Sequence, residues 1–113
     1  MECIFCKIVD GIIPAKKVFE SDQVMAFEDI NKVAPVHILV IPKLHIESLL
    51  ALSPQDAELL AQLQMGITSV AQKTGVADTG FRVVSNCGAS AGQSVFHLHY
   101  HVIGGRELAL SLG

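Results

Sequence analysis

The stretch Ser94–Gly105, SVFHLHYHVIGG, places three histidines at alternate positions in an apolar run. The chain has only five histidines, and His97, His99 and His101 fall within five residues. Side chains in a β-strand alternate between its two faces, so these imidazoles would share one face, about 7 Å apart. The residues on the other face would pack into the core: Phe96, Leu98, Tyr100 and Val102. We therefore expect a strand over residues 95–103 that holds three imidazoles on one side of a sheet.

A row of imidazoles supports either of two chemistries. Neutral imidazole nitrogens bind metals, and a histidine can also act as a nucleophile while its neighbours orient it or move protons. A half-exposed strand that happens to contain histidine is the remaining alternative. The preceding loop, NCGASAGQS, carries Gly88 and Gly92, whose backbone N–H groups can approach an anion closely, while Gln93 and Ser94 add side-chain donors. An anion-binding loop beside the histidines favours attack on phosphorus over a bare metal site.

The rest of the chain predicts an α+β fold with an antiparallel sheet of about five strands. Residues 4–9 can form one or two helical turns before Gly11 and Pro14. Two short strands would flank a turn at Ser21-Asp22, and VHILVIP, residues 36–42, reads as a buried strand that stops at a proline. GFRVVSN, residues 80–86, is a further strand.

Residues 53–74 predict the one long helix. Ser53 is a natural N-cap, Pro54 suits the first helical position, and Gly75 provides a C-terminal stop. Five apolar residues at helical spacing predict the buried stripe: Leu60, Leu63, Ile67, Val70 and Ala71.

Length and composition restrict the class of protein. The 113 residues suit a single domain over 1–113, and the 50% hydrophobic content suggests that a second copy covers part of the surface, which predicts a homodimer. A net charge of −3 without a basic run argues against a nucleic-acid polymer as partner. The chain lacks an apolar run of roughly 20 residues for a membrane span, and its start does not read as a signal peptide. We expect no membrane association and a cytoplasmic location, which also fits three cysteines, an odd count.

The run His97-Leu98-His99-Tyr100-His101-Val102-Ile103 resembles the signature of the histidine triad (HIT) family, in which three histidines alternate with apolar residues. CIFCKIVDGIIPAKKVFESDQVMAFEDI, APVHILVIPKLHI and the segment from Gly80 to Glu107 resemble the Hint branch, the nucleoside phosphoramidate hydrolases. The resemblance implies a homodimer in which two sheets join into one. It also implies binding of purine nucleoside monophosphates such as AMP, and cleavage at the α-phosphorus of their phosphoramidates through a covalent nucleotidyl-histidine.

The resemblance also implies catalytic roles. His99 would be the nucleophile, and His101 would bind phosphate and assist the leaving group. His97 would flank the site and His37 would complete the cluster, although a histidine on an apolar strand can equally be a core residue. No cofactor is expected for catalysis.

The same resemblance places the nucleotide. Asp29 would bind the ribose hydroxyls, with Phe27 and Ile30 near the base. Three residues would line the phosphate and leaving-group side: Asn86, Gln93 and Ser94. Without the resemblance, Asp29 reads as a turn residue and Phe27 as a core residue.

A structural zinc site is the second expectation. Cys3-x-x-Cys6 has the spacing of half a zinc site, and His45 and His97 are the candidates for the other two ligands. Cys3 and Cys6 can alternatively be ordinary small apolar residues on a helix.

Two alternative functions stay open. One is a dinucleoside polyphosphate hydrolase, as in the Fhit branch. The other is a nucleotide- or zinc-binding interaction protein with incidental turnover. Since binding alone needs no nucleophile, the presence of His99 favours an enzyme. The tail, GGRELALSLG, has no tryptophan and leaves the amine part of the substrate unassigned.

Overall fold

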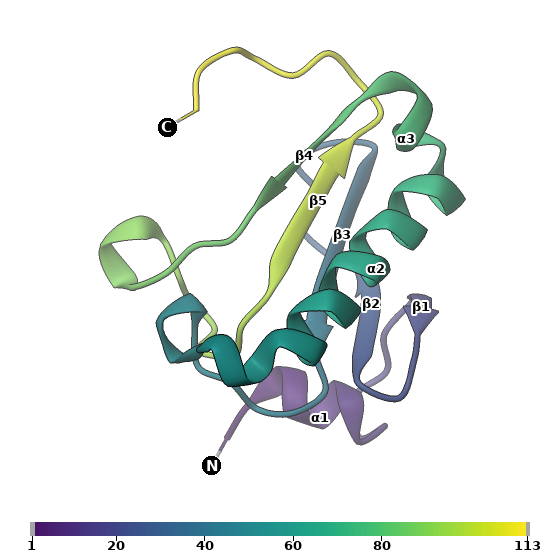
Figure 1. Cartoon of the computed structure of the whole chain (residues 1–113). Helices are drawn as coiled ribbons and strands as arrows, with labels where there is room; N and C mark the ends of the chain where they lie inside the picture. Colours follow the sequence, from purple (N-terminus) through teal and green to yellow (C-terminus); the bar gives the residue numbers. More distant parts are fainter. Residues whose placement is uncertain (1, 113) are drawn as a thin grey trace.

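The computed structural model describes residues 2–112, in which five antiparallel strands form one sheet in the order β1-β2-β3-β5-β4 (Figure 1). The strands are β1 Lys17–Glu20, β2 Val24–Glu28, β3 Val36–Pro42, β4 Phe81–Val84 and β5 Tyr100–Gly104. The helices are α1 Ile4–Val9, α2 Ala57–Thr74 and α3 Val76–Thr79, with 3₁₀ turns at Leu49–Ala51, Pro54–Asp56 and Ala89–Ala91. The predicted α+β fold with one long helix is confirmed.

Local sequence sets the end of α2 and the start of the 3₁₀ turn that precedes it, so the helix predicted over residues 53–74 is α-helical only over Ala57–Thr74. The Ser53 hydroxyl accepts the N–H of Gln55, and the Asp56 carboxylate accepts the N–H of Ser53 at 3.0 Å, which together form a capping box. Gly75 ends the helix with φ at 85°, a conformation that glycine adopts without strain. Within residues 2–112, no helix combines the length and apolar character needed to cross a membrane.

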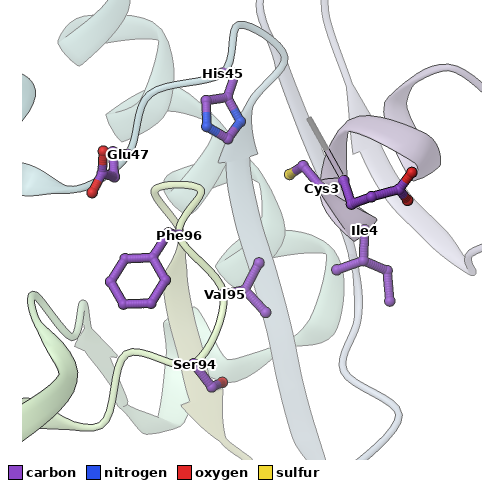
Figure 2. A pocket seen from close by; sticks show the side chains of 8 residues that line it. Cys3, Ile4, His45, Glu47, Ser94, Val95 and Phe96 are labelled. Atoms are coloured by element: carbon purple, nitrogen blue, oxygen red, sulfur yellow. The ribbon is translucent and has the colours of Figure 1, made fainter.

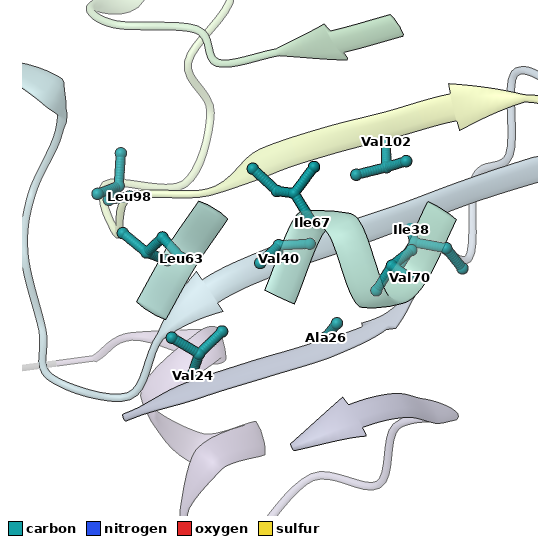
Figure 3. Packing of buried hydrophobic residues seen from close by; sticks show 9 residues of the cluster. All are labelled: Val24, Ala26, Ile38, Val40, Leu63, Ile67, Val70, Leu98 and Val102. Atoms are coloured by element: carbon teal, nitrogen blue, oxygen red, sulfur yellow. The ribbon is translucent and has the colours of Figure 1, made fainter. Parts of the chain in front are cut away.

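Helix α2 covers one face of the sheet (Figure 3). A β-carbon added at Gly66 would lie 3.1 Å from Val24 Cγ1, so the missing side chain allows a close approach of helix and strand. Of the five residues in the predicted stripe, Leu63, Ile67, Val70 and Ala71 are buried. The prediction for Leu60 was wrong: it is 37% exposed, because at the first turns Leu59 packs against the core instead.

Helix α1 covers the opposite face. The strand residues alternate, so that Val24 and Ala26 pack under α2, while Met25 and Phe27 pack with Phe5 of α1. Burial on both faces explains the continuous apolar runs of residues 24–27 in β2 and 38–42 in β3. His37 and His101, two positions apart in the β3–β5 register, lie on the α1 side together with Leu39.

The last strand begins later than the sequence predicts. β5 starts at Tyr100 rather than residue 95, and residues 95–97 form a bend. The reason is a long-range bond: the N–H of Leu98 donates to the carbonyl of Ile46 at 2.6 Å. The bend leaves Phe96 45% exposed, so its predicted core position was wrong, whereas Leu98 and Val102 are in the core as predicted.

Candidate functional site

A cavity of about 610 Å³ lies beside α1, on the sheet face that carries the histidines. Six residues predicted from sequence line it: Phe27, Asp29, Ile30, Ser94, His99 and His101. Phe27 is both a core and a cavity residue, while Ile30 is 94% exposed. Apolar side chains of α1, including Phe5, complete one wall. The cavity thus combines apolar walls with two imidazoles, a hydroxyl, the carboxylates of Glu28 and Asp29, the side chain of Asn31 and two lysines, Lys16 and Lys32.

His99 has one ring nitrogen committed to the backbone. Its Nδ1 lies 2.7 Å from the carbonyl oxygen of His97, which can only accept, so Nδ1 carries the proton. In the neutral ring Nε2 is then left with a free lone pair, on a side chain that lines the cavity. This is the arrangement that a nucleophilic imidazole requires.

His37 and His101 are ordered by a chain of hydrogen bonds. The backbone N–H of Val33 donates to Nδ1 of His37 at 3.1 Å, so the proton of neutral His37 is on Nε2. That nitrogen lies 2.8 Å from Nδ1 of His101, which accepts, and the proton of His101 is consequently on its Nε2. Neutral His101 therefore presents a hydrogen-bond donor on a ring that lines the cavity.

Burial keeps these rings neutral. Desolvation lowers the pKa of His37, against the opposing effect of the Asp29 carboxylate. Desolvation also lowers the pKa of His101 to about 4, with smaller contributions from charge on His99 and His37. At neutral pH, His101 is thus a donor of a hydrogen bond and not a cationic acid in the free protein.

Asp29 has more than one partner. Its Oδ1 accepts the N–H of Asn31 at 2.8 Å, in the turn geometry that sequence alone suggests, and its Oδ2 lies 3.3 Å from Nε2 of His37. The carboxylate also lines the cavity. The turn function and a ligand-binding function are therefore compatible in one residue.

Two groups of side chains within residues 2–112 have the spacing of metal ligands. The first comprises Asp29, His37 and His101. Since Nδ1 of His37 already accepts the N–H of Val33, its Nε2 holds a proton and has no lone pair to offer. The hydrogen-bond pattern therefore favours three side chains linked by shared protons, and not a metal site, at this position.

The second group matches the predicted zinc ligands, Cys3, Cys6, His45 and His97, whose ligand atoms all lie within 4.8 Å of one another. Nδ1 of His97 lies 3.4 Å from the sulfur of Cys3, and Nδ1 of His45 lies 3.3 Å from that of Cys6. Nε2 of His97 donates to the Pro42 carbonyl at 2.8 Å, which leaves Nδ1 with its lone pair facing the sulfurs. Two sulfurs and two imidazole nitrogens form a donor set that suits zinc.

The side chain of Gln93 holds the glycine-rich loop of residues 86–94 in place through hydrogen bonds. The buried Gln93 side chain accepts the N–H of Gly88 at 2.9 Å and donates to the carbonyls of Glu47 and Val95. The side chain of Asn86 donates to the carbonyl of Ala91 at 2.8 Å. Both amides therefore hold the loop in shape, whereas Ser94 is the predicted loop residue that reaches the cavity.

A second cavity of about 490 Å³ lies beyond Ser94 (Figure 2). Ser94, Val95 and Ile4 line both cavities. Cys3 and His45 border the second cavity. This cavity therefore lies next to the predicted zinc ligands Cys3, Cys6, His45 and His97, which we call the thiol–imidazole cluster. The two cavities thus meet at Ser94.

Two contributors to the site have no signal in the sequence. Phe5 contacts the rings of His97 and His99 edge-on, with centroids 5.8 and 5.2 Å apart. The backbone N–H of Val33 sets the tautomer of His37. Neither a single phenylalanine in an apolar helix nor a backbone group forms a motif, so both required the three-dimensional structure.

Comparisons with known proteins match nearly the whole chain to one family. The family model "Scavenger mRNA decapping enzyme C-term binding" matches residues 2–110. Protein HitA of Neisseria gonorrhoeae is 43% identical over 102 residues, which cover 90% of this chain and 94% of HitA. An uncharacterized HIT-like protein of Synechocystis sp. is 48% identical over 108 residues, covering 96% of this chain and 94% of its own length.

Solved structures match over nearly the whole chain. A HIT family hydrolase from Legionella pneumophila superposes with a TM-score of 0.95 at 42% identity, covering 99% of this chain and 100% of its own. A histidine triad protein from Clostridium difficile gives a TM-score of 0.93 at 47% identity, covering 98% of this chain and 96% of its own.

The lowered histidine pKa values predict a pH dependence of stability. Above the ordinary pKa of 6.5 the rings are neutral in both the folded and the unfolded chain. As pH falls from 6.5 towards 4, the unfolded chain binds protons that folded His101 excludes, so the free energy of unfolding decreases, by up to about 1.4 kcal/mol per pH unit for one histidine.

Denaturant titrations between pH 7 and pH 5 measure this slope. The carboxyls of Glu20 and Glu28, whose pKa values are lowered from 4.5 by neighbouring lysines, titrate below that range. We expect His101→Asn to flatten the slope. An unchanged slope in the variant would contradict the assignment to His101.

Proposed function

Because the chain belongs to the histidine triad (HIT) family and is hydrolase-like, we propose that it is a purine nucleoside phosphoramidate hydrolase. Its reaction would release a nucleoside monophosphate and an amine. The observation that carries the proposal is the 2.7 Å bond from His99 Nδ1 to the His97 carbonyl, which leaves an Nε2 lone pair on a cavity-lining ring. A protein that only binds nucleotides has no need of a nucleophile held in this way.

The reaction would proceed in two displacements at the α-phosphorus. In the first, Nε2 of His99 forms a bond to phosphorus as the P–N bond breaks, and the departing amine takes up one proton from solvent, which the water of the second step returns. In the second, water attacks phosphorus, the bond to His99 breaks, and water releases one proton. The net reaction consumes one water molecule and restores neutral His99.

Charge on the transferred group would be stabilised by donors that the fold holds in place. Neutral His101 would donate its Nε2 proton to a phosphoryl oxygen, and the Ser94 hydroxyl would donate a second hydrogen bond. The order of protons from Val33 through His37 to His101 supports the role of His101 as donor. His37 acts through His101 and is in this scheme a positioning residue.

The remaining cavity residues would bind the nucleoside. The Asp29 carboxylate can accept hydrogen bonds from the two ribose hydroxyls, and Phe27 with Ile30 offers apolar contact to a purine. The leaving amine would lie on the far side of Ser94, where the second cavity begins (Figure 2).

We also propose a homodimer formed through strand β4. β4 is one edge of the sheet, and it exposes two apolar side chains, Phe81 at 39% and Val83 at 41%. The opposite edge strand, β1, carries Lys17 and Glu20, and charged residues protect an edge from pairing. Pairing of β4 with a second copy would make one continuous sheet.

Zinc is the cofactor that we propose for the thiol–imidazole cluster. Cys3, Cys6, His45 and His97 would hold it with four protein ligands, which is the pattern of a structural site. Bound zinc would join α1 to the segments after β3 and before β5, and would take no part in the chemical steps.

The catalytic proposal is tested with His99→Ala. We expect release of AMP from an adenosine phosphoramidate to fall at least about 10³-fold, because the covalent route is lost. Binding of AMP, measured by calorimetry, should remain. Mass spectrometry of wild-type protein quenched during turnover should find nucleotide mass on the peptide that contains His99, and the variant should show none.

Turnover in His99→Ala at the wild-type rate would contradict the covalent mechanism. A wild-type protein that cleaves diadenosine polyphosphate faster than the phosphoramidate would replace the proposed substrate with the polyphosphate class.

Metal analysis tests the zinc proposal. Purified protein should contain about one zinc per chain, and removal by a strong chelator should lower the melting temperature, since zinc contributes on the order of 10 kcal/mol in zinc-finger peptides. Cys6→Ser should lose the metal, whereas Cys87→Ser, outside the cluster, should keep it. Equal zinc content in the two variants would disprove the assignment.

Sedimentation measurements test the dimer. Wild-type protein should sediment with twice the mass of one chain. Val83→Lys, which places a charge on the β4 edge, should shift it towards monomer, while Gln23→Lys, in the turn between β1 and β2, should not. A dimer unaffected by Val83→Lys would show that the contact lies elsewhere.

A further inference from the structure

One peptide unit, between His97 and Leu98, directs the ring of His99. Its carbonyl accepts the Nδ1 proton of His99 at 2.7 Å, and its N–H donates to the Ile46 carbonyl at 2.6 Å. A trans peptide unit is planar, and its C=O and N–H point in opposite directions. The bond to Ile46 therefore determines where the carbonyl points, and the carbonyl determines the tautomer and direction of the His99 ring.

Both attachments of this peptide unit lead to the thiol–imidazole cluster. Ile46, which receives the N–H, directly follows His45, whose ring lies 3.3 Å from the sulfur of Cys6. His97, which supplies the carbonyl, has its own ring held at both nitrogens. Nε2 donates to the Pro42 carbonyl, and Nδ1 faces the sulfurs of Cys3 at 3.4 Å and Cys6 at 3.6 Å.

The sheet contributes little to this orientation. Residues 95–99 precede β5 and lie outside its ladder, so strand pairing does not fix the 97–98 unit. A hydrogen bond from the Ser85 hydroxyl holds the carbonyl of His99 at 2.9 Å, which positions the backbone one residue further on. Phe5, between the two cysteines on α1, adds edge contacts to the rings of His97 and His99.

We infer that Cys3, Cys6 and His45 are positioning residues for the His99 nucleophile, acting through the peptide unit between His97 and Leu98. The inference rests on the proposed function for the role of His99, and it gives the cluster a part in turnover beyond folding. When the cluster is broken, the unit is free to rotate and the Nδ1 proton loses its acceptor. Neutral His99 then divides between two tautomers, only one of which has its lone pair on Nε2.

The expected kinetic signature is a loss in kcat with little change in KM. The nucleotide contacts proposed at Phe27, Asp29 and Ile30 do not depend on the 97–98 unit, so ground-state binding persists. In metal sites, removing a residue that orients a ligand through a hydrogen bond typically lowers metal affinity or activity 10- to 100-fold. We therefore expect kcat to fall by about 10-fold or more, with KM within about two-fold.

Cys6→Ser is the variant of choice, because Cys3 also caps α1 by accepting the N–H of Cys6. Ring ¹⁵N chemical shifts should show one tautomer of His99, protonated at Nδ1, in the wild type and a mixture in Cys6→Ser. This readout needs no substrate. The matched control is Val70→Ala, which loosens the α2 side of the core; it should lower stability but retain kcat and the single tautomer.

The outcomes separate the two proposals. Unchanged kcat together with a single Nδ1-protonated tautomer in Cys6→Ser would overturn the inference. An equal loss of kcat in Val70→Ala would overturn it as well, because the effect would then follow stability. If Cys6→Ser does not fold, His45→Gln is measured in the same way and decides by the same criteria. A wild-type protein inactive on phosphoramidates would remove the proposed function, while the tautomer comparison still decides whether the cluster orients His99.

Discussion

The hydrogen bond from His99 to the carbonyl of its neighbour two residues earlier is the constraint on which the site depends. An imidazole has two nitrogens that exchange roles freely in water, and a nucleophile needs one of them free at a fixed place. In His99 a backbone oxygen, which cannot donate, imposes a single proton position. The backbone N–H of Val33 has the corresponding effect on His37, because it leaves the ring proton on Nε2. Through the hydrogen bond from that nitrogen, the proton of His101 is also fixed on Nε2.

The fold supplies these backbone groups by burying the sheet on both faces. Helix α2 covers one face of the sheet and α1 covers part of the other (Figure 1). Gly66 allows the close approach of α2, and the rings of His99 and His101 line the cavity on the α1 side. The cavity forms where α1 and the ends of the strands leave that second face open. Burial also has an electrostatic effect, because it lowers the pKa of His37 and His101 and keeps both rings as ordered hydrogen-bonding groups at neutral pH.

Much of this architecture follows from local sequence. The stop at Gly75 and the strand of residues 36–42 are local features, and both appear as predicted, whereas Ser53 caps the 3₁₀ turn before α2 and not α2 itself. The alternating histidines predict the imidazoles that line the cavity, and the Cys3-x-x-Cys6 spacing predicts the thiol–imidazole cluster. The structure assembles both groups of side chains. Non-local contacts account for the failures. The bend at residues 95–97 depends on Ile46, about fifty positions earlier, and strand alternation in the sequence carries no information about that bond. The hydrogen bonds of the Gln93 side chain, which link the loop to Glu47, are also not visible in the sequence, and its predicted role at the phosphate stays a prediction.

Phe5 illustrates how closely the parts of the site are joined. Its ring contacts that of Phe27 in the cavity wall, with centroids 5.6 Å apart, as well as the rings of His97 and His99. A substitution at residue 5 would therefore change the wall of the cavity and the surroundings of His97 and His99 together. Within this scaffold, evolution cannot reshape the cavity at residue 5 without altering the histidines, whereas Ile30, which lines the same cavity and is almost fully exposed, can vary at little cost to the core.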